Sequence, residues 1–215
     1  MVGFITFEGG DGTGKSTQIR LLERHLIAQG KSCLTTREPG GTPLGQLLRK
    51  ILLESGNHPV SSSTELFLYL ADRAQHVHEV IAPAVTQGKI VLSDRHTDST
   101  VAYQGYGRGF DPQLLLSLNR IASQGLRPDI TFLLDCPVEL GLSRTVHRRS
   151  GPLNAEGGDR FENENLEFHE KVRQGFLDLA RAEPARFYII DASQSEREVF
   201  AAVKEIVDRR LDLSS

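Results

Sequence analysis

Residues 4–17 read Phe-Ile-Thr-Phe-Glu-Gly-Gly-Asp-Gly-Thr-Gly-Lys-Ser-Thr, a short apolar run followed by a glycine-dense loop. Gly9, Gly14, Lys15 and Ser16 have the spacing of a phosphate-binding P-loop. Glycines let successive backbone N–H groups turn toward an anion, and a helix starting near Lys15 adds its positive N-terminal end. Lys15 can reach the β- and γ-phosphates, and the Ser16 hydroxyl can hold Mg²⁺. The stretch predicts a nucleoside triphosphate site.

Composition narrows the class of protein. The 215 residues are 39% hydrophobic and 25% charged, as in an ordinary globular protein of one domain or slightly more. A formal net charge of -3 argues against a nucleic-acid-binding surface. The first predicted strand leaves no room for a signal peptide, and no apolar run approaches membrane length. We expect a cytoplasmic protein whose partners are neither nucleic acids nor membranes.

The rest of the chain alternates between strand and helix patterns. Runs rich in β-formers occur at residues 4–7, 33–36, 90–93, 130–135 and 187–191. Helical patterns occur at residues 16–29, 44–53, 65–85, 112–123, 138–149, 163–182 and 197–211. These runs are continuously apolar and do not alternate as strands with one solvent-exposed face do, so both faces of the sheet are expected to be covered. The pattern predicts an α/β fold with a doubly wound, five-stranded parallel sheet and helices on both faces.

One segment lacks a regular pattern. Residues 150–159 read Ser-Gly-Pro-Leu-Asn-Ala-Glu-Gly-Gly-Asp and are flanked by Arg148, Arg149 and Arg160. A glycine-rich segment between arginines is typical of a short lid over a nucleotide site, and a solvated surface loop is the alternative. We therefore predict a single P-loop domain over residues 1–215 with a lid at about 148–160.

Charged residues follow two of the predicted strands. Because ligands bind beyond the carboxyl ends of parallel strands, these residues are candidates for the site. Asp94 can hold Mg²⁺ or cap a following helix, and Arg95 can meet a phosphate with its planar guanidinium group. Arg37 begins the turn Arg-Glu-Pro-Gly-Gly-Thr, and Arg49 lies on the next predicted helix. If Arg37, Arg49 and Arg95 converge rather than face solvent, they predict a second phosphate site.

Phe67 and Arg73 lie six residues apart on one predicted helix, and we expect them roughly on one face of it. A phenylalanine at helical spacing is usually a core residue. The functional alternative is that Phe67 stacks on a base in a cleft while Arg73 donates a hydrogen bond to a carbonyl oxygen of the base.

Taken together, these motifs resemble those of bacterial-type thymidylate kinases over essentially the whole chain. The most specific segment is residues 92–104, Leu-Ser-Asp-Arg-His-Thr-Asp-Ser-Thr-Val-Ala-Tyr-Gln. The Arg-Glu-Pro-Gly-Gly-Thr turn and residues 159–162, Asp-Arg-Phe-Glu, support the resemblance. It implies an ATP-dependent transfer of a phosphoryl group to dTMP, giving dTDP, with Mg²⁺ and in a homodimer.

The resemblance also implies roles for particular residues. Around ATP it implies Gly9, Gly10, Asp11, Gly12, Thr13, Gly14, Lys15, Ser16, Thr17 and Arg144, and at the metal Ser16 and Asp94. Around dTMP it implies Asp11 at the 3′-hydroxyl, Tyr103 at the 2′ position, Phe67, Arg73, Thr100 and Gln104 at the base, and Arg37, Arg49 and Arg95 at the phosphate. Lys15 and Arg95 are also expected to take part in catalysis.

The loop from Gly9 to Thr17 contains no arginine, although some similar kinases carry one there. We therefore expect Arg148, Arg149 or Arg160 to neutralise the transferring group. Two other enzymes stay possible at this stage, a deoxynucleoside kinase, in which Glu38 would be the base, and another nucleoside monophosphate kinase. A nucleotide-operated switch is the alternative from a different class.

Overall fold

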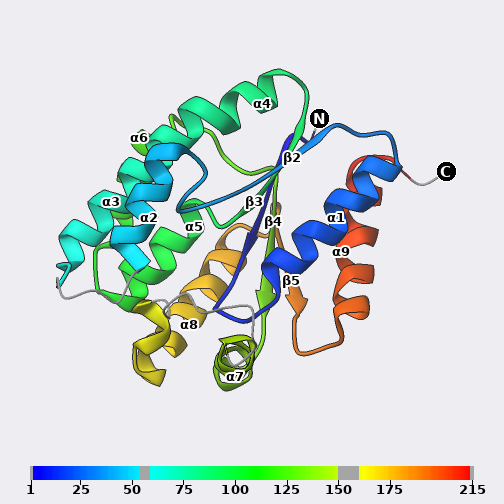
Figure 1. Ribbon diagram of the computed structural model, residues 1–215. Coiled ribbons are helices and arrows are strands. Elements are labelled where there is room, and N and C mark those ends of the chain that lie inside the picture. Colours follow the sequence, from blue (N-terminus) through cyan, green and yellow to red (C-terminus); the bar gives the residue numbers. More distant parts are fainter. Residues whose placement is uncertain (1, 54–58, 150–159, 214–215) are drawn as a thin grey trace.

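A computed structural model describes residues 2–53, 59–149 and 160–213 (Figure 1). Its sheet has the strand order β2-β3-β1-β4-β5, and all pairings are parallel. The strands are β1 (Phe4–Glu8), β2 (Cys33–Arg37), β3 (Ile90–Asp94), β4 (Ile130–Asp135) and β5 (Phe187–Asp191). The predicted α/β fold with a five-stranded parallel sheet is confirmed.

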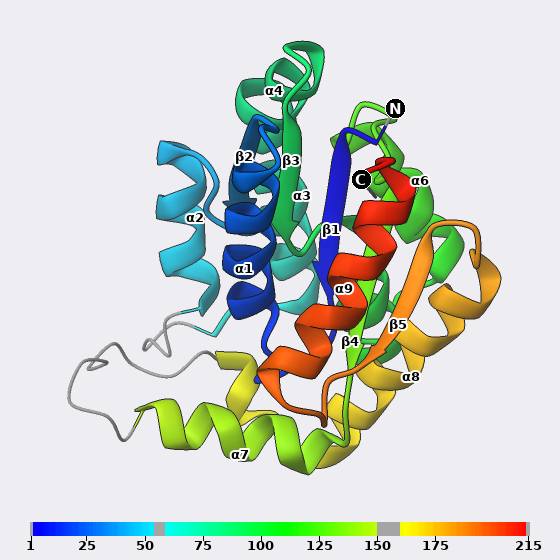
Figure 2. The same cartoon turned by 90° about the vertical axis from the view of Figure 1, so that its right-hand side faces the viewer.

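The helices cover both faces of the sheet (Figures 1 and 2). The longer helices are α1 (Lys15–Ala28), α2 (Pro43–Leu53), α3 (Ser62–His76), α6 (Pro112–Ala122), α7 (Val138–Arg149), α8 (Leu166–Ala182) and α9 (Glu196–Arg210). The shorter elements are η1 (Val77–Ile81), α4 (Ala82–Thr86), α5 (Thr97–Thr100), η2 (Val101–Gly107) and η3 (Arg160–Asn163). Helices α1 and α9 lie side by side on one face, and α3, α5 and α8 lie on the other.

Alternating residues of β1 explain why both faces are covered. Ile5 and Phe7 pack toward α1 and α9 with Leu22 and Val203, while Phe4 belongs to a second apolar cluster on the opposite face. Residues Phe4–Glu8 are all buried, as expected for a central parallel strand.

Two helical segments differ from the sequence pattern. The predicted helix 65–85 is interrupted by the wider π-turns of η1, because Pro83 has no N–H to donate within a regular helix. Residues 97–107, for which no helix was predicted, form α5 and η2. Gly107 lets η2 approach α8, since a Cβ atom at this position would lie 2.5 Å from the Phe168 ring.

The strand ends bring the predicted site residues to one edge. Arg37 and Asp94 are register partners at the carboxyl ends of β2 and β3, and Phe7 of β1 pairs with Asp94 from the other side.

Among the described helices, none is both long enough and apolar enough to cross a membrane.

Candidate active site

The loop between β1 and α1 has the backbone shape that the P-loop motif requires. Gly9 and Gly12 have φ angles of 129° and 72°, which favour glycine. A Cβ atom at Gly9 would lie 2.3 Å from the Leu134 carbonyl oxygen, and one at Gly12 would lie 2.0 Å from that of Gly141. The loop therefore depends on glycine both for its dihedral angles and for its close packing on β4 and α7.

Lys15 is buried at the start of α1, where its ammonium group lies against the loop. Its Nζ donates to the carbonyl oxygens of Gly9 at 3.1 Å and Gly10 at 2.7 Å. Burial, with a smaller contribution from the nearby Arg95, lowers the pKa of Lys15 to about 8. A polyanion at the P-loop would favour the charged form of this side chain.

Ser16 and Asp94 form a pair of oxygen donors beside the loop. The Ser16 hydroxyl donates to Asp94 Oδ2 at 2.7 Å. Mg²⁺ is usually held by one or two protein oxygens together with substrate phosphates and water, so a hydroxyl next to a carboxylate fits this ion. Among the described residues, no group of three or more His, Cys, Asp or Glu side chains could hold a metal by itself.

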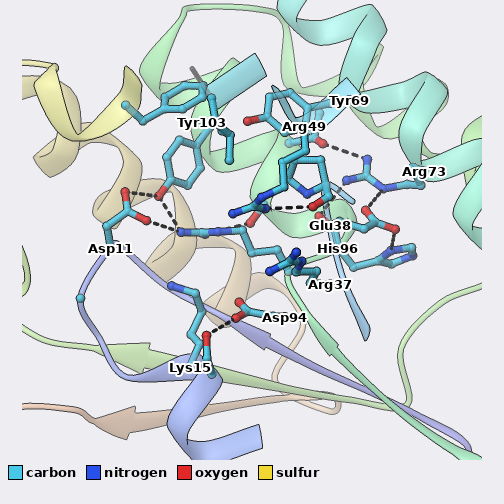
Figure 3. A pocket seen from close by; sticks show the side chains of 18 of the residues that line it. Asp11, Lys15, Arg37, Glu38, Arg49, Tyr69, Arg73, Asp94, His96 and Tyr103 are labelled. Carbon is cyan, nitrogen blue, oxygen red and sulfur yellow. Dashed lines mark hydrogen bonds and ion pairs between the residues drawn. The ribbon is translucent and has the colours of Figure 1, made fainter. Parts of the chain in front are cut away.

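A cavity of about 270 Å³ extends from the P-loop to an aromatic end. In Figure 3, Lys15 and Asp94 lie at one end, Tyr69 and Tyr103 at the other, and Arg37 and Arg49 between them. The cavity is lined by Asp11, Gly12, Gly14, Lys15, Ser16, Thr17, Arg37, Glu38, Pro39, Arg49, Leu53, Tyr69, Arg73, Asp94, Arg95, His96, Ser99, Thr100, Tyr103, Gln104 and Phe161.

Three arginines from different elements line the middle of this cavity. Arg37 ends β2, Arg49 lies on α2, and Arg95 follows β3. Arg49 Nη1 donates to the Pro39 carbonyl oxygen at 2.9 Å. Three cations around one solvent-accessible space can bind a phosphate group.

Arg95 is held in an uncommon backbone conformation, with a φ angle of 71°. Its guanidinium group donates to Gly9 O at 2.9 Å, Asp11 Oδ1 at 2.7 Å and Tyr103 Oη at 3.0 Å. Burial alone would raise the pKa of Asp11, but Arg95 and Lys15 hold it below the ordinary value. Arg95 thus connects the P-loop with the aromatic end of the cavity.

The comparisons with known proteins fit this geometry. A sequence profile described as "Thymidylate kinase" matches residues 7–203. The chain is 53% identical over 208 residues to the thymidylate kinase of Geotalea uraniireducens, covering 97% of each chain. It is also 53% identical to that of Solidesulfovibrio magneticus, covering 97% of this chain and 100% of the relative. The crystal structure of thymidylate kinase from Ehrlichia chaffeensis matches with a TM-score of 0.76 and 34% identity, covering 96% of this chain and 98% of the other.

The chain belongs to the thymidylate kinase family. In this family member, the aromatic end of the cavity differs from the sequence prediction in one residue. Phe67 is 62% exposed and does not line the cavity, whereas Tyr69 does. Successive helical residues are rotated by about 100°, so a residue six positions before Arg73 points away from it and one four positions before lies on the same face. The assignment of Phe67 to the cavity is therefore wrong, and Tyr69 occupies the place that was expected for it.

Arg73 is buried in a polar network behind this end of the kinase cavity. Its Nε donates to Glu38 Oε2 at 2.8 Å, its Nη1 to Thr100 Oγ1 at 2.9 Å and Asn119 Oδ1 at 2.6 Å, and its Nη2 to the His96 carbonyl oxygen at 3.0 Å. Burial opposes the charge of Glu38, but Arg73 and His96 hold the pKa of this carboxyl well below its ordinary value. The network fixes the guanidinium group at the cavity wall.

Other predicted residues of the kinase lie in or near this region. Thr100, Tyr103 and Gln104 line the main cavity. Gly9, Gly10 and Thr13 line a smaller cavity of about 20 Å³ behind the loop. Arg144 lines neither cavity, but its Nη1 donates to the Ala192 carbonyl oxygen at 2.8 Å in the turn after β5.

Arg160, a candidate for neutralising the transferring group, does not line the main cavity, and its catalytic role stays a prediction. Its Nη2 donates to Glu65 Oε2 at 2.6 Å and its Nε to the Leu52 carbonyl oxygen at 3.2 Å, and it is absent from the lining of the main cavity. These acceptors on α2 and α3 hold the guanidinium group in place. Residues 150–159 and the side chains of Arg148 and Arg149 lie outside the described part of the chain, so the lid stays a prediction.

Several residues of the kinase site were not predicted. Phe161, within the Asp-Arg-Phe-Glu motif, lines the cavity and contacts Tyr103 edge to face with ring centroids 5.4 Å apart. Glu8 accepts from the His96 N–H at 2.8 Å and from Ser99 Oγ at 2.6 Å. Burial, with Asp98 nearby, raises the pKa of Glu8 to about 8. The four-residue spacing between Tyr69 and Arg73 could have predicted that Tyr69 faces the cavity. The hydrogen bonds of Glu8 could not be predicted in this way, because its partners are distant in sequence.

Proposed function

We propose that the chain transfers the γ-phosphoryl group of ATP to dTMP, giving dTDP. The observation that carries this proposal is a single cavity with a P-loop at one end, three arginines in the middle and an aromatic wall at the other. This arrangement suits two phosphate groups and a flat base. The full-length likeness to proteins named thymidylate kinase favours dTMP over the deoxynucleoside kinase and other monophosphate kinase alternatives.

At the ATP side, the P-loop amides and Lys15 would bind the β- and γ-phosphates, as in other P-loop enzymes. Arg144 and the turn Asp191-Ala192-Ser193 would flank the adenine, as the family resemblance implies, and the hydrogen bond from Arg144 to the Ala192 carbonyl oxygen holds the two together. Ser16 and Asp94 would hold Mg²⁺ directly or through water. When bound, the ion would neutralise charge on the phosphate oxygens.

At the dTMP side, the guanidinium groups of Arg37, Arg49 and Arg95 would hold the phosphate. Tyr69, rather than Phe67, would stack on thymine. Arg73 would donate to the base O4, and Thr100 and Gln104 would face the N3 edge. The closeness of Tyr103 Oη to Asp11 Oδ2, at 3.4 Å, suits a sugar whose 3′-hydroxyl meets Asp11 and whose 2′ position lies against the tyrosine.

Catalysis would then consist of alignment and charge neutralisation. The phosphate of dTMP is already an anionic nucleophile, so no side chain has to remove a proton from it. Lys15 and Arg95 would stabilise charge on the transferring group, together with Arg148 or Arg149.

A coupled assay of ADP formation tests the proposal with dTMP, dUMP, dCMP, AMP, GMP and thymidine as acceptors. We expect dTMP to be the preferred acceptor and the reaction to require Mg²⁺. A preference for thymidine would support the deoxynucleoside kinase instead. ATP hydrolysis that does not respond to any acceptor would support the nucleotide switch.

We also infer that the enzyme acts as a homodimer in the cytoplasm. Exposed apolar side chains on α2, α3 and α6 support the dimer. Cell fractionation tests the location, because recovery of the enzyme with membranes or in the culture medium would contradict it.

A further inference from the structure

The carboxylate of Glu65 joins several side chains at the buried face of α3. Its side chain is 1% exposed. It accepts hydrogen bonds from Gln104 Nε2 at 2.9 Å, from Arg160 Nη2 at 2.6 Å, and from Arg108 Nε at 3.3 Å and Nη2 at 3.2 Å. Glu65 does not line the main cavity, so it would act on a ligand only through one of these partners.

Gln104 is the partner that lines the cavity. A carboxylate only accepts hydrogen bonds, so the Gln104 amide must turn its NH₂ group toward Glu65. The carbonyl oxygen is then the end of the amide that is available to a ligand. Without a carboxylate at this position, either end of the amide could face the cavity.

Arg73 supplies a donor next to this acceptor. Among the described residues, acceptors are present for four of its five guanidinium N–H groups, which leaves one N–H of Nη2 for a ligand. Thr100 accepts from Arg73 and lies one helical turn before Gln104, so the three side chains share one wall of the aromatic end. This wall offers a fixed donor beside a fixed acceptor.

We propose that Glu65 is a specificity-determining residue, because it sets the direction of the Gln104 amide and so makes the pocket select an imide edge. Thymine and uracil present a carbonyl oxygen beside a ring N–H, which complements a donor beside an acceptor. Cytosine presents an amino group beside a bare ring nitrogen, so donor would face donor and acceptor would face acceptor. The inference rests on the proposed function and deepens it.

The test compares kcat/KM for dTMP with kcat/KM for dCMP. Sites that hydrogen-bond a substrate group reject an analogue lacking it by about 10⁴-fold, so a large ratio is expected for the unmodified enzyme. Glutamine at position 65 can donate as well as accept, and the Gln104 amide can then turn over. We expect Glu65→Gln to lower the ratio at least about 10-fold, which is a small part of that discrimination.

Glu164→Gln is the matched control. Like Glu65, Glu164 forms an ion pair with Arg108, with 2.7 Å between Glu164 Oε1 and Arg108 Nη1. Unlike Glu65, it does not accept the hydrogen bond from Gln104. Its substitution should leave the dTMP/dCMP ratio unchanged. An equal fall of the ratio in both variants would overturn the inference.

A double-mutant cycle separates amide orientation from a general structural effect. With Gln104→Met there is no amide to orient, so adding Glu65→Gln should change the ratio less than about 2-fold if the two residues act as one unit. The same loss in both backgrounds would mean that Glu65 acts through Arg108 or Arg160, and would overturn the inference. Glu65→Gln leaves the guanidinium group of Arg160 without its carboxylate partner and could fail to fold for that reason. In that case the double variant Glu65→Gln/Arg160→Met, which removes this cation, is compared with Arg160→Met alone.

The unmodified enzyme distinguishes this inference from the proposed function. Failure to phosphorylate dTMP would overturn both. Phosphorylation of dTMP with an unchanged ratio in Glu65→Gln would overturn the inference alone.

Discussion

At the scale of single residues, the placement of Tyr69 and Phe67 leads to opposite predictions for two aromatic side chains on one helix. Stacking of a base on an aromatic ring is worth about 1–3 kcal/mol, so Tyr69→Ala should lower kcat/KM for dTMP about 10- to 100-fold, mainly through KM. Phe67→Ala should leave KM near that of the unmodified enzyme, since Phe67 is exposed outside the cavity. Steady-state kinetics with varied dTMP measures both. A larger loss with Phe67→Ala would contradict the structural assignment.

Asp72 is a buried carboxyl behind the turn that follows β2. Its Oδ1 accepts the Gly40 N–H at 3.0 Å, and its Oδ2 has no hydrogen-bond partner among the described residues. Burial and the Glu38 carboxylate raise the pKa of Asp72 to about 6 from an ordinary value of 3.8. The folded state therefore binds this proton more tightly than the unfolded state, and the ionised form destabilises the fold as the pH rises from 4 through 6.

Asp72→Asn should consequently stabilise the protein more at pH 8 than at pH 4. Asparagine keeps an acceptor for Gly40 and carries no charge, so the difference between the two pH values should reach about 3 kcal/mol at most. Thermal unfolding of both proteins at each pH measures it, with the exposed Asp212→Asn as the control. A gain in Tm that is the same at both pH values would rule out the ionisation of Asp72 as its cause.

At the scale of secondary-structure elements, the contact between η2 and α8 depends on a glycine inside a helix. A Cβ atom at Gly175 would lie 2.7 Å from Cγ of Tyr106, close to that ring's point of attachment. Helix propensity alone would make Gly175→Ala stabilising by about 1 kcal/mol, whereas overpacking costs about 1–3 kcal/mol. Because the ring is anchored near the clash, we expect net destabilisation.

Urea unfolding of Gly175→Ala measures this balance. Glu170→Ala is the control, since Glu170 is exposed on the same helix and alanine there gains helix propensity without a clash. A more stable Gly175→Ala protein would mean that η2 can move away from α8 without cost.

The predicted lid arginines also belong to this scale. Loss of an arginine that neutralises the transferring phosphoryl group lowers kcat by about 10³-fold or more, and we expect this of Arg148→Ala or Arg149→Ala. Arg160→Ala should change kcat far less, because its guanidinium group is held by Glu65 and Leu52 and does not line the main cavity. Steady-state kinetics at saturating ATP and dTMP measures kcat for the single and double variants. If kcat stays within a few-fold of the unmodified enzyme in all of them, the lid arginines have no catalytic role.

At the scale of the whole molecule, exposed apolar side chains gather on the helices of one side. Helix α3 packs against both α2 and α6. Their exposed apolar residues are Leu44, Leu47, Ile51, Phe67, Leu114, Leu116 and Ile121. No surplus apolar stripe was evident in the sequence, because each helix contributes only a few of these residues. A surface of this kind is typical of a protein–protein interface.

We expect this surface to form the homodimer interface. Phe67→Glu combined with Ile121→Glu should reduce the native mass from two chains to one, since burying two carboxylates against apolar residues is unfavourable. Analytical ultracentrifugation measures the mass. Ile189→Glu is the control, because Ile189 is 51% exposed on β5, away from these helices. A dimer that survives the double substitution would place the interface elsewhere.

The sequence by itself determined the order of strands and helices along the chain and the P-loop, and it named three arginines as candidates for a second phosphate site. These features are local: apolar runs define the parallel strands, glycines permit the loop, and strand ends place polar residues at one edge of the sheet. Tertiary structure alone decided that 97–107 is helical and that Glu65 binds both Gln104 and Arg160. Such pairings bring together residues 39 and 95 positions apart, and their geometry depends on how helices pack rather than on any local pattern.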